Sequence, residues 1–179
     1  MKKLLSLLAL FAVILTSCTG DPGPPGRDGF DGVDGLDAEY AKVIEVTTDF
    51  NYDGTNGIWF TNFIDFPSNV EFLDGDAVLA YRLEDVVDGL DVWTQLPHNF
   101  FLAEGTMQYV FTHTTGDIQF IIDGNFDLSN IATDYTDTQT FRYVLIPTEF
   151  AENFNGDFSN LNAVMNALEL QESDVKKLN

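Results

Sequence analysis

The chain has 179 residues, a formal net charge of −21 at pH 7 and an aromatic content of 13%. A charge of this sign and size repels nucleic acid and anionic lipid headgroups, so the composition excludes nucleic acid as a partner. The aromatic and apolar content also excludes a disordered chain beyond Tyr40. Residues 38–179 are numerous enough for one globular domain with a core of its own.

The chain begins with a short apolar leader that ends at its only cysteine. Lys2 and Lys3 precede the apolar run Leu4–Ile14, which fits a signal-peptide h-region and is shorter than the ~20 residues that span a bilayer. The following Leu15-Thr16-Ser17-Cys18 resembles the lipobox of bacterial lipoproteins. The resemblance implies a signal peptide over residues 1–17 and a lipid-anchored Cys18 that tethers the protein to the membrane. The alternative is an ordinary cleaved signal in which the cysteine has no role.

A collagen-like tract follows over residues 18–37. Glycine occupies every third position, as three polyproline-II chains need in order to pack around one axis; the residues are Gly20, Gly23, Gly26, Gly29, Gly32 and Gly35. The tract allows two interpretations, a homotrimer wound through the Gly-X-Y repeat or a single-chain extended spacer. Aspartates at every third position of its second half favour the spacer, because three wound chains would crowd their carboxylates together.

The order of lipobox, Gly-X-Y tract and β-domain is similar to that of bacterial collagen-like lipoproteins. The resemblance is specific for residues 1–37 and general for the remainder. It implies a location in the cell envelope, with display at the outer membrane or cell surface. In the sorting rule of the resembled class an Asp after the lipidated cysteine retains the protein at the inner membrane, and Thr19 stands there in this chain.

From Ala41 onward the apolar pattern alternates with period two far more than with period 3.6, which predicts β-strands. The strands are expected over 44–50, 58–64, 77–84, 92–96, 107–114, 117–122 and 141–145. Thr115-Gly116 predicts a hairpin turn between the fifth and sixth of these. Asp-Gly, Asn-Gly and Pro signals between short strands are typical of an antiparallel β-sandwich-like domain, so the fold class is mainly β.

One short helix is expected near the C-terminus. Ser159 or Asn160 is placed to cap it. Its apolar residues fall at i, i+3, i+4 and i+7, which is the spacing of one helix face; they are Leu161, Val164, Met165 and Leu168. Ser173 is expected to cap a final helical turn that runs through Leu178.

The loop after the first expected strand contains a pattern that resembles a calcium-binding loop. Asp49, Asn51 and Asp53, followed by Gly54, match the opening of an EF-hand loop. Phe60 occupies the position where that loop needs a bidentate Glu, and strands rather than helices flank it. A polar hairpin loop is therefore the favoured interpretation, and Ca²⁺ bound at these three residues is the alternative.

The large aromatic residues offer a second candidate site. Trp59 and Trp93 are candidates for stacking on a ligand such as a sugar, although large aromatics in a β-domain of this size mostly pack in the core. The adjacent Phe100 and Phe101 cannot both point inward from one strand, so one of them is expected to face a second layer or a partner.

No arrangement of catalytic residues is recognisable in the sequence. His98 and His113 have no metal-binding spacing, and no G-x-S-x-G motif occurs. We therefore expect a non-catalytic surface lipoprotein that acts as a structural, adhesion or display module on its stalk. The alternative is a β-sandwich module that binds carbohydrate or peptide and is stabilised by calcium.

Overall fold

The computed structural model describes residues 42–68, 70 and 72–178. The signal peptide, Cys18 and the glycines of the Gly-X-Y tract lie outside the described residues, and the predictions made for them stay predictions. In chain order the strands are β1 (Lys42–Thr48), β2 (Asn51–Asp53), β3 (Ile58–Phe60), β4 (Ile64–Asp65), β5 (Ala77–Val87), β6 (Leu90–Gln95), β7 (His98–Phe101), β8 (Thr106–His113), β9 (Asp117–Gly124), β10 (Gln139–Ile146) and β11 (Lys176–Leu178). The α-helices are α2 (Thr148–Asn153) and α3 (Leu161–Ala167), with short 3₁₀ turns η1 (Leu128–Asn130), η2 (Thr133–Tyr135) and η3 (Glu172–Asp174).

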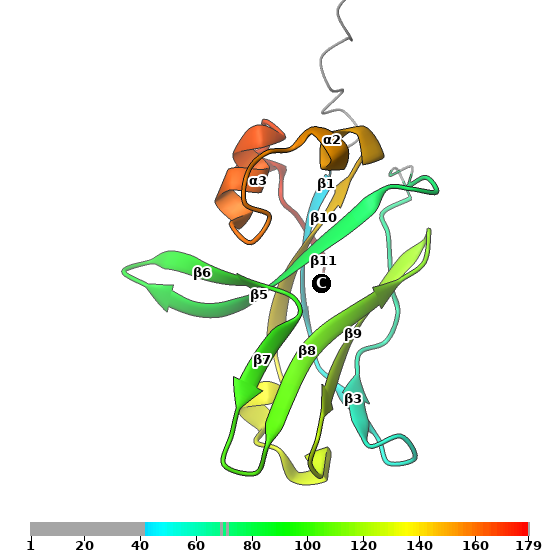
Figure 1. The fold of residues 1–179 in the computed structure, drawn as a ribbon, viewed down its shortest axis with the longest axis vertical. Coiled ribbons are helices and arrows are strands. Elements are labelled where there is room, and N and C mark those ends of the chain that lie inside the picture. The colour runs from blue at the N-terminus through cyan, green and yellow to red at the C-terminus, as the bar shows by residue number, and fades with distance from the viewer. Residues whose placement is uncertain (1–41, 69, 71, 179) are drawn as a thin grey trace, which may run out of the picture. The chain divides into compact units, whose positions relative to one another are not determined.

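The strands form two sheets in a sandwich-like arrangement (Figure 1). Sheet A has the order β11-β1-β10-β5-β6, and sheet B has the order β2-β3-β9-β8-β7 with β4 paired to β9. The described pairings are antiparallel except for β11, which runs parallel to β1. The structure confirms a mainly β fold with antiparallel sheets and a short C-terminal helix.

Side chains from the facing sides of the two sheets fill the main core. The rings of Phe120 on β9 and Phe141 on β10 stack with centroids 4.0 Å apart, which joins the centres of the sheets. Phe50 packs edge-on against Phe141, at a centroid distance of 6.0 Å. Offset and edge-to-face contacts of this kind add to the burial of apolar area that drives folding.

A second, smaller core lies between sheet A and the two helices. Val43, Tyr81, Val144 and Ile146 point away from sheet B and pack with apolar side chains of α2 and α3. The predicted cap of α3 is confirmed, because the side chain of Asn160 accepts a hydrogen bond from the backbone N–H of Ala163. The centre of sheet A, formed by β1, β10 and the first half of β5, is therefore buried on both faces.

The strand predicted over 58–64 is wrong as a continuous element. The buried Thr61 separates β3 from β4, since its backbone N–H donates to the carbonyl of Phe120 and its hydroxyl accepts from the N–H of Phe120. The chain then leaves the ladder, and Phe63, which an unbroken strand would place on the same face as Trp59, is 59% exposed.

The end of the chain also differs from its prediction. The expected helical turn through Leu178 is limited to η3, and Lys176–Leu178 forms β11 instead. Pairing with β1 satisfies backbone groups at the edge of sheet A, and it places Leu178 against the main core. Helix α2, directly after Pro147, was not predicted. None of the helices in the described residues is long and apolar enough to cross a membrane.

Candidate functional site

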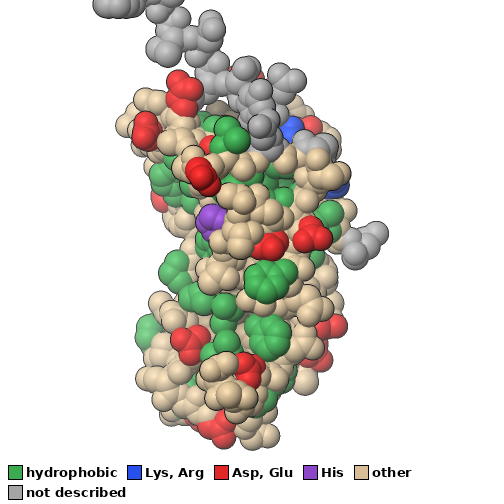
Figure 2. Space-filling model, turned by 90° about the vertical axis from the view of Figure 1, so that its right-hand side faces the viewer, with side chains coloured by type: hydrophobic (Ala, Val, Ile, Leu, Met, Phe, Trp, Pro, Cys, Tyr) green, Lys and Arg blue, Asp and Glu red, His purple; other side chains and the backbone are tan. Residues whose placement is uncertain are grey.

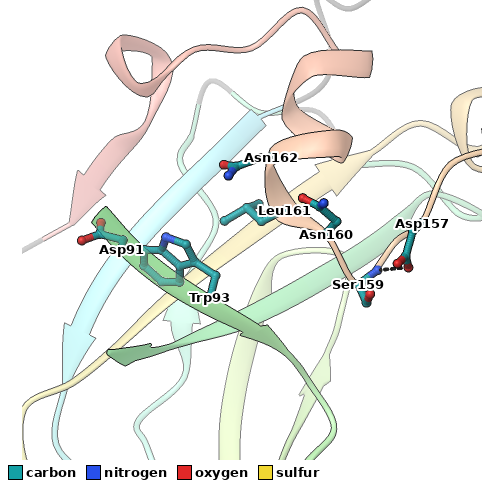
Figure 3. Close-up of a pocket in the computed structure, with 7 residues that line it drawn as sticks. All are labelled: Asp91, Trp93, Asp157, Ser159, Asn160, Leu161 and Asn162. Atoms are coloured by element: carbon teal, nitrogen blue, oxygen red, sulfur yellow. Dashed lines mark hydrogen bonds between the residues drawn. The ribbon is translucent and has the colours of Figure 1, made fainter. Parts of the chain in front are cut away.

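A shallow groove of about 300 Å³ lies between strand β6 and the start of α3. Figure 3 shows its two sides, with Asp91 and Trp93 on β6 and with Asn160, Leu161 and Asn162 at the beginning of the helix. The loop before α3 completes the lining with Asp157 and Ser159. Apart from Trp93 and the buried Leu161, every side chain of the lining carries a polar group.

The loop side of the groove is held by its own hydrogen bonds. Asp157 accepts the backbone N–H of Ser159 at 2.9 Å. Hydrogen bonds from the side chain and backbone of Ser159 hold the pKa of Asp157 below its usual value, so this carboxylate is ionised at neutral pH. The neighbouring Asn160 is fixed as the cap of α3. These bonds give the groove a preformed wall of hydrogen-bonding groups.

A buried tyrosine ties this loop to the sheet beneath it. The hydroxyl of Tyr81 on β5 donates to the carbonyl of Phe158 at 2.5 Å. Burial, together with the nearby charge of Asp157, raises the pKa of Tyr81, so the hydroxyl keeps its proton and remains a donor. The loop that carries Asp157 and Ser159 is thus attached to a strand at the centre of the fold.

The other wall depends on the half-buried Trp93, whose ring rests on a buried arginine. The guanidinium carbon of Arg142 lies 4.4 Å from the ring centroid of Trp93, over one of its faces. The side chain of Arg142 is only 2% exposed, so this contact is shielded from water. The arginine therefore fixes the tryptophan ring that lines the groove.

Acidic residues from three elements compensate the charge of Arg142. Its Nε donates to Glu45 on β1 at 2.8 Å, and its two terminal nitrogens donate to Glu172 at 2.7 Å each. Asp91, which lines the groove, lies 3.9 Å from the same guanidinium. Burial alone would lower the pKa of Arg142, but Glu172 and Glu45 hold it above its usual value. The planar guanidinium thus uses its donors in the fork geometry that suits carboxylates.

The two predicted tryptophans do not share a site. Trp59 packs against the main core between the sheets; its indole N–H donates to the carbonyl of Leu128 at 2.8 Å, and its ring contacts Tyr52 at 5.1 Å. Trp93 packs on the other side of sheet A, against the helix core. Of the two, only Trp93 borders the groove.

The candidate calcium residues are used in local hydrogen bonds. Asp53 accepts bonds from the backbone of Thr55 and from the backbone and side chain of Asn56, which closes the turn between β2 and β3. Asp49 accepts the backbone N–H of Thr138 at 2.7 Å, and Asn51 is exposed on β2. The described residues contain no group of three or more His, Cys, Asp or Glu side chains placed to hold a metal ion. Calcium at this loop stays a prediction.

Sequence reasoning missed most of the groove, and also Arg142, which supports Trp93. A signal was present, because Arg142 is flanked by Phe141 and Tyr143 and is the one charged residue of β10. A basic residue inside such an apolar strand indicates a buried ion pair. Its acidic partners Glu45 and Glu172 are 97 and 30 residues away along the chain, and only the fold brings them together.

The groove offers one aromatic ring, two carboxylates, two amides and a hydroxyl at a shallow surface. Such a set of groups suits a ligand with an apolar face and many hydroxyls. No family model, curated protein or solved structure matches this chain.

Proposed function

We propose that this protein is a non-catalytic surface lipoprotein whose β-domain binds carbohydrate through the Trp93 groove. In this proposal Cys18 carries the lipid anchor, the Gly-X-Y tract holds the domain away from the membrane, and the groove attaches the cell to a glycan. The two hypotheses from the sequence, an adhesion module and a carbohydrate-binding module, then describe one function.

The observation that carries the proposal is a half-buried tryptophan beside polar groups in a shallow, preformed groove. The C–H face of a pyranose packs against an indole ring, while its hydroxyl edge needs donors and acceptors to replace lost water. Asp91, Asn162 and Ser159 supply such groups around Trp93. A peptide side chain would instead seek a deeper apolar pocket than this lining provides.

The fixed position of the lining supports the same conclusion. Arg142 holds Trp93 from below, and Tyr81 holds the opposing loop through Phe158. A site whose side chains are already ordered loses little conformational entropy when a ligand binds. Weakly binding sugars depend on such preorganisation, because each of their hydrogen bonds contributes only about 1 kcal/mol net.

Glycan-array screening of the detergent-solubilised full-length protein, followed by calorimetry on the best ligand, tests the proposal. Trp93→Ala is expected to weaken binding by about tenfold or more, and Asn162→Ala by about fivefold, as the loss of one hydrogen bond predicts. Tyr52→Ala is the matched control, since this aromatic residue is 37% exposed and lies away from the groove. Equal loss in the control, or no loss in Trp93→Ala, would contradict the proposed site.

The anchor is tested separately. Growth with labelled palmitate should mark the wild-type protein, and Cys18→Ser should abolish the label and release the protein from the membrane fraction. Wild-type protein without label would refute the lipid anchor while leaving the groove untouched.

A further inference from the structure

A second polar hollow, of about 320 Å³, lies on the outer face of sheet B. This face points away from the main core, whereas the Trp93 groove lies beyond sheet A on the other side of the sandwich. The residues that line the hollow come from β7, β8 and β9 and from the turns that join them; they are Asn99, Thr106, Gln108, Asp123, Gly124 and Asn125.

Three of these side chains form a straight row across the strands. Asn99 on β7 is paired with Gln108 on β8, and Gln108 is paired with Asp123 on β9. Directly opposed residues share one face of a sheet, and neighbouring strands are ~4.8 Å apart, so the three polar ends lie within about 10 Å. Within the part of the chain that the structure describes, the side-chain amides of Asn99 and Gln108 make no hydrogen bond. They are therefore available to a ligand.

Asn125 is fixed at one end of the row. Its Oδ1 accepts the backbone N–H of Thr106 at 2.8 Å, and the amide nitrogen is left to donate outward. The close approach requires glycine at position 105, where φ is +154° and an added Cβ would collide with the Asn125 side chain. The β7–β8 turn is thus shaped around an asparagine that borders the hollow.

An exposed aromatic ring stands beside this row. Phe101 is 84% exposed, the highest value among the large hydrophobic residues in the described part of the chain. It lies opposite Thr106, which lines the hollow, and two residues from Asn99 on the same face of β7. Its neighbour Phe100 points into the main core, as the alternation of the strand requires. The ring therefore contributes area to a ligand on this face and little to the fold.

We propose that this outer face of sheet B is a second carbohydrate site, which takes a neutral polysaccharide. A pyranose ring packs its C–H face on Phe101, and its hydroxyls exchange hydrogen bonds with Asn99, Gln108 and Asp123. The ligand is uncharged because Asp123 and the net charge of −21 repel sulfated or uronic-acid chains. The site goes beyond the proposed Trp93 function and does not depend on it.

Two sites on opposite sides of one domain have a consequence for adhesion. A single molecule can hold two polysaccharide chains at once, or two segments of one long chain. In the second case the second binding event becomes intramolecular, and the overall affinity exceeds that of either site.

Affinity electrophoresis of the full-length protein in gels that contain soluble mixed-linkage β-glucan, arabinoxylan or galactomannan tests the inference. The measurements use the Trp93→Ala variant, so that binding at the first groove contributes little; if Trp93→Ala fails to fold, Asn162→Ala, which weakens that groove about fivefold, replaces it. Retardation by at least one of the three neutral polymers is expected, and adding Phe101→Ala or the pair Asn99→Ala and Gln108→Ala should weaken it about tenfold or more. No retardation by any of the three polymers would overturn the proposal.

Phe63→Ala is the matched control, because Phe63 is also an exposed phenylalanine, at 59%, and it follows β3 rather than β7. It should leave retardation unchanged, and the same loss in this control would overturn the assignment to Phe101. Retardation by the anionic polymer alginate in place of the neutral ones would also overturn it. If Trp93→Ala binds as well as wild type while Phe101→Ala abolishes binding, the inference stands and the Trp93 proposal fails.

Discussion

The outer faces of the two sheets follow the same strand geometry but have opposite environments. On sheet A, the outward side chains Val144 and Ile146 are 0% and 1% exposed under α2 and α3. On sheet B, the outward row Phe60, Ile121 and Val110 is only half-buried. Figure 2 shows the side of the molecule where β3 and β9 lie, with hydrophobic side chains at the surface between acidic ones.

The difference indicates that the covered face of sheet A contributes more to stability, whereas the outer face of sheet B is available for binding. The centre of sheet A, over β1, β10 and the first half of β5, is covered on both faces, so substitutions on either face there should lower stability. Sheet B buries one face and leaves the other for amides, threonines and isolated apolar side chains, which is typical of an antiparallel sheet with one solvated side. The second carbohydrate site lies on that free face, and the Trp93 groove lies where the cover of sheet A ends.

A matched pair of substitutions measures this contrast directly. Ile146→Ala should lower the free energy of unfolding by about 4 kcal/mol, because it removes buried methyl groups and leaves a cavity under the helices. Ile121→Ala on the outer face of sheet B should lower it by about 1 kcal/mol, since solvent already reaches that side chain. Chemical denaturation gives both values, and equal losses would show that the outer face of sheet B is covered after all.

The second prediction concerns the charge at the edge of the covered face. Arg142→Leu should lower the free energy of unfolding by about 3 kcal/mol, because Glu45 would keep a largely buried charge with only the exposed Lys177 as its partner. Lys177→Ala is the control on the same network; Lys177 is 65% exposed, so its loss should matter by less than 1 kcal/mol. If both variants unfold at the same denaturant concentration, the network around Arg142 contributes nothing beyond an ordinary surface ion pair.

The sequence predicted most strands of both sheets, but it did not show which faces of the sheet A strands are covered. The β8–β9 hairpin with its turn at Thr115-Gly116 is confirmed, because a sheet with one solvated face keeps the alternation of apolar and polar residues. Strand β10 and the first half of β5 are buried on both faces, so alternation does not reveal which side is covered. Arg82, a charged residue in such a strand, is buried between the sheets over the rings of Tyr109 and Phe100.

The candidate sites depend even more on tertiary structure. Trp93 was identified from its residue type, and Asp91 precedes it on β6, but Asn160 and Asn162 become its neighbours only when α3 packs against sheet A. The row of Asn99, Gln108 and Asp123 requires the register of three strands, which composition does not contain. What the sequence did indicate was that Phe100 and Phe101 point to opposite sides, and the exposed one marks the second site.

A substitution at the cap of α3 should weaken the helix that covers sheet A without changing the core residues. Asn160→Ala should lower the free energy of unfolding by about 1 kcal/mol, because the N–H of Ala163 loses its capping partner. Asn162→Ala, two residues further along the exposed side of α3, should change stability by less than about 0.5 kcal/mol. Thermal unfolding followed by circular dichroism separates the two variants. A neutral Asn160→Ala would mean that packing alone positions the helix.

The last and smallest predicted effect is the pH dependence of the stability that Glu45 contributes. Burial would raise the pKa of Glu45, but hydrogen bonds from Lys177 and Arg142 hold it below its ordinary 4.5. A carboxyl with a lowered folded-state pKa stabilises the fold above pH 4.5, and that contribution is lost as the pH falls through the folded-state value. Solvent screens the exposed partner Lys177, which keeps the effect small.

The melting temperatures of wild type and Glu45→Gln, measured from pH 7 to pH 3, test this prediction. The wild-type protein should melt higher at pH 7, and the difference should shrink below pH 4.5, because a protonated Glu45 resembles the glutamine in charge and shape. A difference that stays constant to pH 3 would mean that Glu45 stabilises sheet A by packing instead. The covered and the open faces would then differ only in apolar burial, with no part played by the charges around Arg142.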